Sequence, residues 1–305
     1  MKKLEIIDKI ELLKPDLLSD KKSFNEVYFW IKMFVSEVGW HYPLDLIWQY
    51  KKIMELDLPK GSTILDAGAG DGMMQFILAG QGYNILSVDF SERKLPLLQS
   101  KIFKMKNDKH KIIKNDYTKH LSANYKFSFA KFFHKIKLSF KNLSIFYIIK
   151  GFVNKKKYGS IQYIRSDFSD LSFLQSNSID AVVSTSAIEH NPEHENLKKA
   201  IVEFNRVLKP KSAMFITTSA INKKCFFDKP TKGYLYDENT LLNIFQLSKH
   251  KSNFSKYSEI FNQIFACNFL KENIGFGYKN NPNCGLPFGI WNPKYLPVGV
   301  IKWKK

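Results

Sequence analysis

Residues 64–72 decide the fold, and they read Ile64-Leu65-Asp66-Ala67-Gly68-Ala69-Gly70-Asp71-Gly72. A short apolar run comes first, and three glycines follow at alternate positions. Glycine is needed where the backbone turns sharply and another group approaches closely. Exposed N–H groups at the beginning of a helix favour a carboxylate or a phosphate. The stretch therefore predicts a strand, a tight ligand-binding turn and a helix over residues 73–78.

Short apolar segments alternate with helical patterns after this turn, which is typical of a doubly wound parallel sheet. Strands are predicted at residues 63–65, 84–88, 161–164, 180–184 and 213–218. A last apolar run at 295–303 and another before it are candidates for the final two strands. We expect an α/β, Rossmann-like fold in which residues 61–305 form one domain.

Two segments fall outside this alternation. Residues 1–60 carry apolar side chains at helical spacing, which predicts an N-terminal helical cap. Asp89 and Asp167 follow the second and third strands and are 78 positions apart, where one strand–helix repeat needs only about 30. A basic helical insertion is therefore predicted at about 105–159. Its apolar face consists of Phe129, Phe132, Phe133, Ile136, Phe140, Leu143 and Tyr147.

The composition is that of a folded protein, with 44% hydrophobic and 25% charged residues. The formal charge is +19, but only three of the 47 basic residues are arginines, the side chain that reads nucleic acid best. Nucleic acid is therefore a disfavoured partner. Three cysteines without metal-ligand or disulfide spacing indicate a reducing compartment. With no apolar leader in the first residues, we expect a cytoplasmic protein.

The glycine pattern separates two cofactor classes. A dinucleotide fingerprint, GxGxxG, read from Gly68 requires glycine at Met73 and is disfavoured. The pattern DxGxGxG at Asp66, Gly68, Gly70 and Gly72 instead resembles the first motif of class I S-adenosylmethionine-dependent methyltransferases. That resemblance implies S-adenosylmethionine as cofactor and a seven-stranded sheet whose last strand is antiparallel.

Later positions extend the resemblance in the order of the family. Asp89, with Phe90 after it, ends the second strand 23 residues after Asp66, where the family binds the ribose hydroxyls. Asp167 matches the acid that accepts from the adenine amino group, and Phe168 the residue that packs on the ring. The fourth-strand motif ends at Ser184. Lys211 and Ser212 replace a glycine pair usual after the fifth-strand lead-in.

The sequence predicts a catalytic residue less clearly, because methyl transfer requires a base only when the acceptor carries a proton. His190 is the best candidate base, since it follows the fourth strand, and Glu189 is placed to orient it. The alternative is that the pair only shapes the pocket wall. Ser186 stands where some methyltransferases have a metal-binding Glu, so no metal is expected.

The acceptor is not specified. We expect a small molecule or a glycan- or lipid-linked metabolite, with an RNA methyltransferase or a non-catalytic cofactor-binding scaffold as alternatives. The basic insertion is either a lid over the acceptor or a helix that contacts the inner membrane face. His41, Tyr42, Tyr234 and Tyr236 are candidate substrate contacts, although aromatic clusters more often belong to a core.

Overall fold

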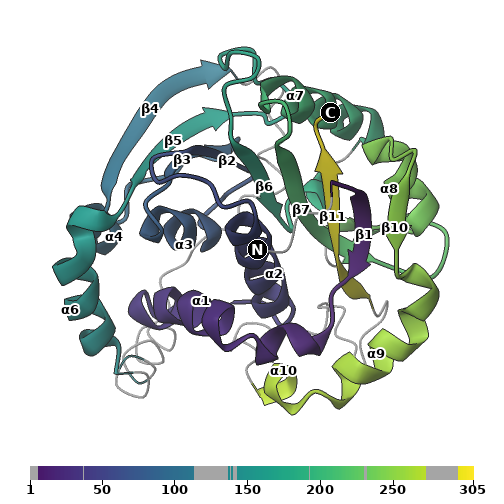
Figure 1. Cartoon of the computed structure of the whole chain (residues 1–305), viewed down its shortest axis with the longest axis horizontal. Helices are drawn as coiled ribbons and strands as arrows, with labels where there is room; N and C mark the ends of the chain where they lie inside the picture. Colours follow the sequence, from purple (N-terminus) through teal and green to yellow (C-terminus); the bar gives the residue numbers. More distant parts are fainter. Residues whose placement is uncertain are drawn as a thin grey trace.

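A single large sheet organises the molecule (Figure 1). The computed structural model describes residues 6–36, 38–112, 137, 139, 143–191, 193–229, 232–272 and 295–305. Among these residues the sheet has nine strands, in the order β10-β1-β11-β7-β6-β2-β3-β5-β4. The expected number of seven is therefore wrong, because both edges carry additional strands.

The central parallel strands confirm the prediction. They are β2 (Thr63–Ala67), β3 (Asn84–Asp89), β5 (Ser160–Ser166), β6 (Ala181–Thr185) and β7 (Ala213–Ala220). Almost every side chain of β2, β6 and β7 is buried, as expected for strands covered on both faces. Their carboxyl ends share one edge of the sheet, and the residues that follow β2, β3, β5 and β6 meet there.

The last strand, β11 (Leu296–Trp303), runs antiparallel to β7, as the family resemblance implies. The next strand is a correction. β1 (Asp8–Leu12), from the predicted helical cap, pairs antiparallel with β11 and parallel with the short β10 (His250–Ser252). Ile10 and Leu12 are buried while Lys9 and Glu11 alternate with them, the two-residue period of a half-covered strand.

The insertion begins with another correction. Residues predicted to start a helical segment form β4 (Lys104–Ile112), a parallel edge strand on β5. Helix α4 (Leu97–Ile102) precedes it, and α6 (Ser144–Asn154) comes before β5. Most of the predicted apolar face, from Phe129 to Phe140, lies outside the described residues. Of that face, Tyr147 is in α6 and Leu143 directly precedes the helix.

Helices α1 (Lys21–Met33), α2 (Tyr42–Glu55) and α3 (Met74–Gly80) lie together on the inner side of the curved sheet (Figure 1). Helix α2 packs on β6, β7 and β11, and α3 packs on β3 and β5. Helices α7 (His194–Val207) and α8 (Glu238–Phe245) pack on each other on its outer side. The other strands and α-helices are β8 (Phe226–Asp228), β9 (Gly233–Leu235), α9 (Tyr257–Ala266) and α10 (Asn268–Glu272). Short 3-10 helices span Pro15–Ser19, Lys155–Lys157, Ile188–His190 and Phe254–Lys256.

Candidate cofactor and acceptor site

The turn after β2 has the backbone that its glycines predict. Gly68 and Gly70 have φ angles of +69° and +46°, in the left-handed region where a side chain is strained. A Cβ added to Gly68 would lie 2.5 Å from Cβ of Ala187, which follows β6. A Cβ added to Gly72 would lie 2.8 Å from the Ala69 carbonyl oxygen. The turn is therefore closed to larger residues.

Asp89 ends β3 and joins this turn directly. The Gly70 N–H donates to its Oδ2 at 2.8 Å, and the Ser91 N–H and hydroxyl both donate to its Oδ1. Each carboxylate oxygen accepts about two hydrogen bonds. One acceptor position thus remains on Oδ2, so one ribose hydroxyl fits directly and a second requires the Ser91 hydroxyl to rotate away.

Asp66 is buried at the end of β2, and burial raises its pKa to about 7, while nearby Arg93 opposes that rise. The buried Arg93 guanidinium donates to the Gly70 carbonyl at 2.9 Å and to the Ser87 hydroxyl at 2.7 Å. It also lies 4.1 Å from the centre of the Tyr163 ring. Arg93 thus ties the glycine turn to β3 and β5.

Sequence reasoning missed Arg93 and also Gln75, whose amide donates to the Gly72 carbonyl at 2.9 Å and accepts from Ser87. The one available signal was that Arg93 is among only three arginines of a lysine-rich chain. A guanidinium forms several hydrogen bonds at fixed angles, which a lysine cannot reproduce.

The residues after β5 complete the cofactor side. The Phe168 ring reaches the turn, 3.4 Å from where a Cβ on Gly68 would stand. Asp167 accepts from the Ser169 N–H with Oδ1 at 2.8 Å, and Oδ2 has no hydrogen bond within the described residues. A free carboxylate oxygen beside an exposed turn and an aromatic ring suits an adenine amino group and base. The donor set therefore fits the adenosine part of S-adenosylmethionine.

Two predicted cofactor residues are placed less directly. Phe90 is half-buried, and its carbonyl accepts from the Arg165 side chain at 3.1 Å. Ser184 is fully buried inside β6, and within the described part of the chain its hydroxyl has no hydrogen-bond partner. Gln49 of α2 occupies the Ser184 carbonyl at 2.8 Å. The Ser184 side chain thus has no described contact with the glycine turn, and its role stays a prediction.

Glu189 and His190 lie in a short 3-10 helix after β6 and face different partners. Glu189 is buried, accepts from the Thr218 hydroxyl at 3.0 Å, and has a pKa raised by that burial. His190 is exposed, with Nδ1 2.8 Å from the Lys232 carbonyl oxygen. A backbone carbonyl, rather than Glu189, therefore holds the His190 ring.

The beginning of α2 contributes a second group to this edge. His41 Nδ1 lies 2.6 Å from Asp45 Oδ2, and the Ser186 hydroxyl donates to the same oxygen at 3.2 Å. The His41 ring stacks on Tyr42 and meets Tyr295 edge-on, with centroids 4.9 and 5.8 Å apart. An aromatic wall thus flanks the end of β6. Of the sequence candidates, His41 and Tyr42 join this wall.

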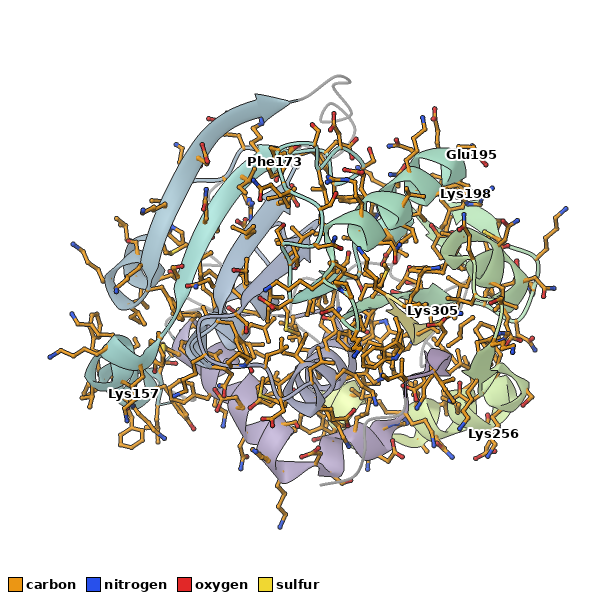
Figure 2. The ribbon with its side chains drawn as sticks, turned by 45° about the horizontal axis from the view of Figure 1, so that its top comes forward. Lys157, Phe173, Glu195, Lys198, Lys256 and Lys305 are labelled. Atoms are coloured by element: carbon orange, nitrogen blue, oxygen red, sulfur yellow. The ribbon has the colours of Figure 1, made fainter. Side chains whose placement is uncertain are left out.

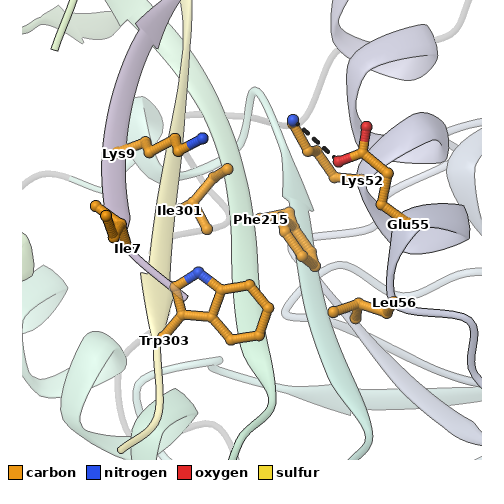
Figure 3. Close-up of a pocket in the computed structure, with 8 residues that line it drawn as sticks. All are labelled: Ile7, Lys9, Lys52, Glu55, Leu56, Phe215, Ile301 and Trp303. Atoms are coloured by element: carbon orange, nitrogen blue, oxygen red, sulfur yellow. Dashed lines mark hydrogen bonds and ion pairs between the residues drawn. The ribbon is translucent and has the colours of Figure 1, made fainter. Parts of the chain in front are cut away.

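Tyr234 and Tyr236 stack on each other at 5.9 Å and are grouped with His194, and the Tyr236 hydroxyl donates to the Ile188 carbonyl in the loop after β6. Figure 3 shows another hollow, between α2 and the far ends of the strands. Its volume is about 60 Å³, well below the roughly 300 Å³ of small-ligand sites. It is lined by Ile7, Lys9, Lys52, Glu55, Leu56, Phe215, Ile301 and Trp303. Trp303 pairs with Ala213 at the start of β7, so this hollow lies opposite the glycine turn.

Comparison with known families gives one match. Residues 138–216 match the model of a methyltransferase domain. The matched segment runs through α6, β5, β6 and α7 into β7, and the glycine turn precedes it. No curated protein matches the chain in sequence.

Solved methyltransferases of low identity are similar to the chain. One from Methanosarcina mazei is 17% identical, with a TM-score of 0.39, over 64% of this chain and 82% of its own. Phosphoethanolamine N-methyltransferase 2 of Haemonchus contortus is 15% identical (TM-score 0.43) over 95% of this chain, which spans 59% of that protein. Geranyl diphosphate C-methyltransferase of Streptomyces coelicolor is 10% identical (0.40), over 84% and 75%.

The strand order, the antiparallel last strand and the glycine turn define a Rossmann-like α/β protein with a site for an adenosine-containing cofactor. The methyltransferase-domain match specifies that class further. Residues 138–216 are similar to a methyltransferase domain whose family uses S-adenosylmethionine as its cofactor.

Proposed function

We propose that this protein transfers the methyl group of S-adenosylmethionine to a small molecule or to a glycan- or lipid-linked metabolite. The observation that carries the proposal is the convergence of the motif residues on one turn. Asp89 accepts from Gly70, Phe168 reaches Gly68, and Ala187 contacts the same glycine position. Residues from three strand ends therefore act on one ligand-binding turn.

The residues of the chain bind, orient and shield. The glycine turn and the Asp89 and Asp167 carboxylates hold the adenosine part, and Arg93 keeps the turn in shape. When bound, S-adenosylmethionine supplies an electrophilic methyl group on a sulfonium. Most of the catalytic gain in such a displacement comes from orientation and exclusion of water.

The acceptor side supports a small organic acceptor rather than a polyanion. Trp40, His41, Tyr42 and Tyr295 form ring contacts with one another beside the end of β6. Aromatic walls with a few fixed polar groups are typical of small-molecule sites. Phosphate-binding surfaces are instead built from exposed cationic side chains.

Calorimetric titration with S-adenosylhomocysteine, run beside NADH, tests the cofactor half. We expect micromolar binding of S-adenosylhomocysteine and none of NADH. Asp89→Ala removes hydrogen bonds to a charged acceptor and should weaken binding about 10- to 150-fold. Glu92→Ala is the matched control, because Glu92 is an exposed acid three residues away, and its affinity should stay within about twofold. Folded wild-type protein that binds NADH instead would contradict the proposal.

The acceptor half is tested with S-adenosylmethionine tritiated on the methyl group. p-Nitrophenol, glucosamine, dodecyl glucoside and transfer RNA serve as probes of four acceptor classes. Label on one of the first three supports the proposal. Label on transfer RNA alone would replace it with an RNA methyltransferase.

A further inference from the structure

The side chains at the beginning of α2 form a buried acid–base pair. Asp45 is completely buried and His41 nearly so, with 0% and 8% of their side chains exposed. Their separation of 2.6 Å and spacing of four residues place them one above the other on the same helix face. Asp45 therefore fixes the orientation of the His41 ring and engages its Nδ1.

A short chain of contacts connects this pair to the glycine turn. Ser186 donates to Asp45 Oδ2, and its neighbour Ala187 lies against the Gly68 position. Ser186 has a φ of +45°, which is strained for a residue with a side chain. The pair thus packs on the loop after β6, where ligands of open α/β sheets bind.

The pair also has unused hydrogen-bonding capacity. The buried Asp45 Oδ1 has no hydrogen-bond partner among the residues that the structure describes, which costs about 1–3 kcal/mol in a fold without compensation. On His41, Asp45 takes Nδ1, and Nε2 has no hydrogen bond within the described part of the chain. A protein built only for stability gains from filling such positions, whereas functional sites retain them.

We propose that His41 is the catalytic base that takes the proton of the methyl acceptor at Nε2, and that Asp45 is the positioning residue that holds the ring. This inference rests on the proposed function. A lone pair of the acceptor oxygen or nitrogen forms the bond to the methyl carbon, and the carbon–sulfur bond breaks with its electron pair going to sulfur. The acceptor proton passes to His41 Nε2 and is later released to water.

The groups that face His41 come from three directions. Asp45 stands on its own helix, Glu189 on the loop after β6 acts on it electrostatically, and Tyr42 and Tyr295 contact the ring. His190, by comparison, is exposed and held by a backbone carbonyl.

The first test needs no acceptor. In ¹⁵N-histidine NMR spectra assigned with His41→Gln, we expect the His41 ring at pH 8 to carry one proton, on Nδ1. Asp45→Asn should abolish that preference and produce a mixed tautomer, while S-adenosylhomocysteine affinity stays within about threefold. A ring that is still doubly protonated at pH 9 would show a structural ion pair that cannot accept a proton, and would overturn the proposal.

The second test uses the acceptor probe that gives the highest turnover. His41→Gln should lower kcat about 100- to 10,000-fold with little change in S-adenosylhomocysteine affinity, as expected for loss of a general base. The acidic limb of the pH profile should disappear. His250→Gln, in the edge strand β10, is the matched control and should retain wild-type kcat.

Comparison of variants separates the possible failures. A loss with His190→Gln but not with His41→Gln would assign the base to His190 and overturn the inference, while leaving methyl transfer intact. Absence of S-adenosylhomocysteine binding by the wild type would instead refute the proposed function itself.

A second inference rests on a different part of the molecule, the outer face of α6. One side of this helix packs on α1, where Gly151 lies so close to Met33 that an added Cβ would stand 2.6 Å from its methyl carbon. The other side is exposed and apolar. Its residues and exposed fractions are Ile145 65%, Phe146 65%, Ile149 57% and Val153 76%.

Exposed lysines border this face. Lys150 lies within the helix, and Lys155, Lys156 and Lys157 follow it. Figure 2 shows Lys157 at the outer margin of the molecule, beside α6. In the described residues no helix is long and apolar enough to cross a bilayer. An apolar face bordered by lysines is complementary to the surface of an anionic bilayer, with headgroups for the ammonium groups.

We infer that the apolar face of α6 binds anionic lipid surfaces peripherally. Sedimentation with vesicles of phosphatidylcholine, with and without 30 mol% phosphatidylglycerol as a chosen composition, tests this. We expect binding only to the anionic vesicles, reduced by salt. Phe146→Ser with Ile149→Ser should weaken binding at least tenfold, and Val202→Ser, an exposed valine on α7, should not. No binding, or dimerisation lost in the double variant, would overturn the inference.

Discussion

The two sides of the site are built in different ways. On the cofactor side, adjacent strand ends supply Asp66 near the end of β2, Asp89 as the last residue of β3, and Asp167 directly after β5. On the acceptor side, His41 and Asp45 come from the beginning of α2, and Asp45 bonds to Ser186, which is more than 140 residues away in the sequence. The first arrangement follows from local sequence, since parallel strands end at one edge. The second depends on how α2 crosses the sheet.

This difference explains why the cofactor side could be predicted from the sequence and the acceptor side could not. The glycines and strand-end acids have fixed spacing, because each must follow its own strand. The spacing between residues 41 and 186 does not indicate that the two regions meet, because several other strands and helices lie between α2 and β6 in the sequence. We therefore expect substitutions on the two sides to separate binding of the cofactor from turnover.

The largest effect is expected at the turn. Gly68→Ala adds about 1–2 kcal/mol of backbone strain and about 1–3 kcal/mol from the collision with Ala187. Urea denaturation should show a loss of about 2–5 kcal/mol, together with loss of S-adenosylhomocysteine binding. Gly61→Ala is the matched control, because Gly61 has φ +86° and no atom near its Cβ position, and it should lose only the strain. Equal losses in the two variants would contradict the collision.

Asp66 should make the free energy of unfolding of the protein depend on pH. Burial raises its pKa to about 7, whereas an unfolded Asp titrates near about 3.9. Between these values the folded protein holds a proton that the unfolded chain has released, so the free energy of unfolding falls as pH rises from about 4 to 7. Asp66→Asn should lack this fall of about 4 kcal/mol, and the exposed Asp71→Asn should retain it. Equal slopes of the free energy of unfolding against pH for Asp66→Asn and wild type would contradict this prediction.

A smaller effect is expected from the arginine that braces the turn. Arg93→Lys keeps the charge but cannot bond the Gly70 carbonyl and Ser87 together. S-adenosylhomocysteine affinity should fall about 5- to 20-fold, on the order of 1–2 kcal/mol. Arg165→Lys is the control, because among the described residues that side chain bonds to the Phe90 carbonyl and the exposed Glu92 rather than to the turn. Unchanged affinity in Arg93→Lys would show that the turn holds its shape without it.

The smallest effect is expected from the number of hydrogen bonds that the Asp89 carboxylate can accept. Ser91→Ala frees one acceptor position on Oδ1, so both ribose hydroxyls can reach the carboxylate. We expect S-adenosylhomocysteine to bind about two- to fivefold more tightly, within about 1 kcal/mol. Ser100→Ala, which removes an exposed hydroxyl bonded to the Leu97 carbonyl, should leave the affinity unchanged. Weaker binding by Ser91→Ala would show that Ser91 itself contacts the ligand.

The sequence-based predictions failed where pairing partners are distant. Residues 8–12 alternate apolar and charged side chains over so short a run that helix and strand patterns overlap. Only pairing with Leu296–Trp303, almost the whole chain away, makes them a strand. Most of Lys104–Ile112 falls in the helical insertion that the spacing of Asp89 and Asp167 predicts, yet this segment forms a strand that adds to the open edge of β5. An edge strand tolerates charges that a central strand does not.

The parallel core, the glycine turn and the acids at the ends of β3 and β5 can be predicted from the amino-acid sequence, because backbone conformation and strand alternation are local properties. The groups that surround the turn depend on the tertiary packing. Through this packing, Arg93 donates to the Gly70 carbonyl and Ser186 donates to Asp45. Glu189 and His190 contact different partners. Such contacts arise from packing of distant segments, and packing depends on the shape of the whole core rather than on spacing along the chain.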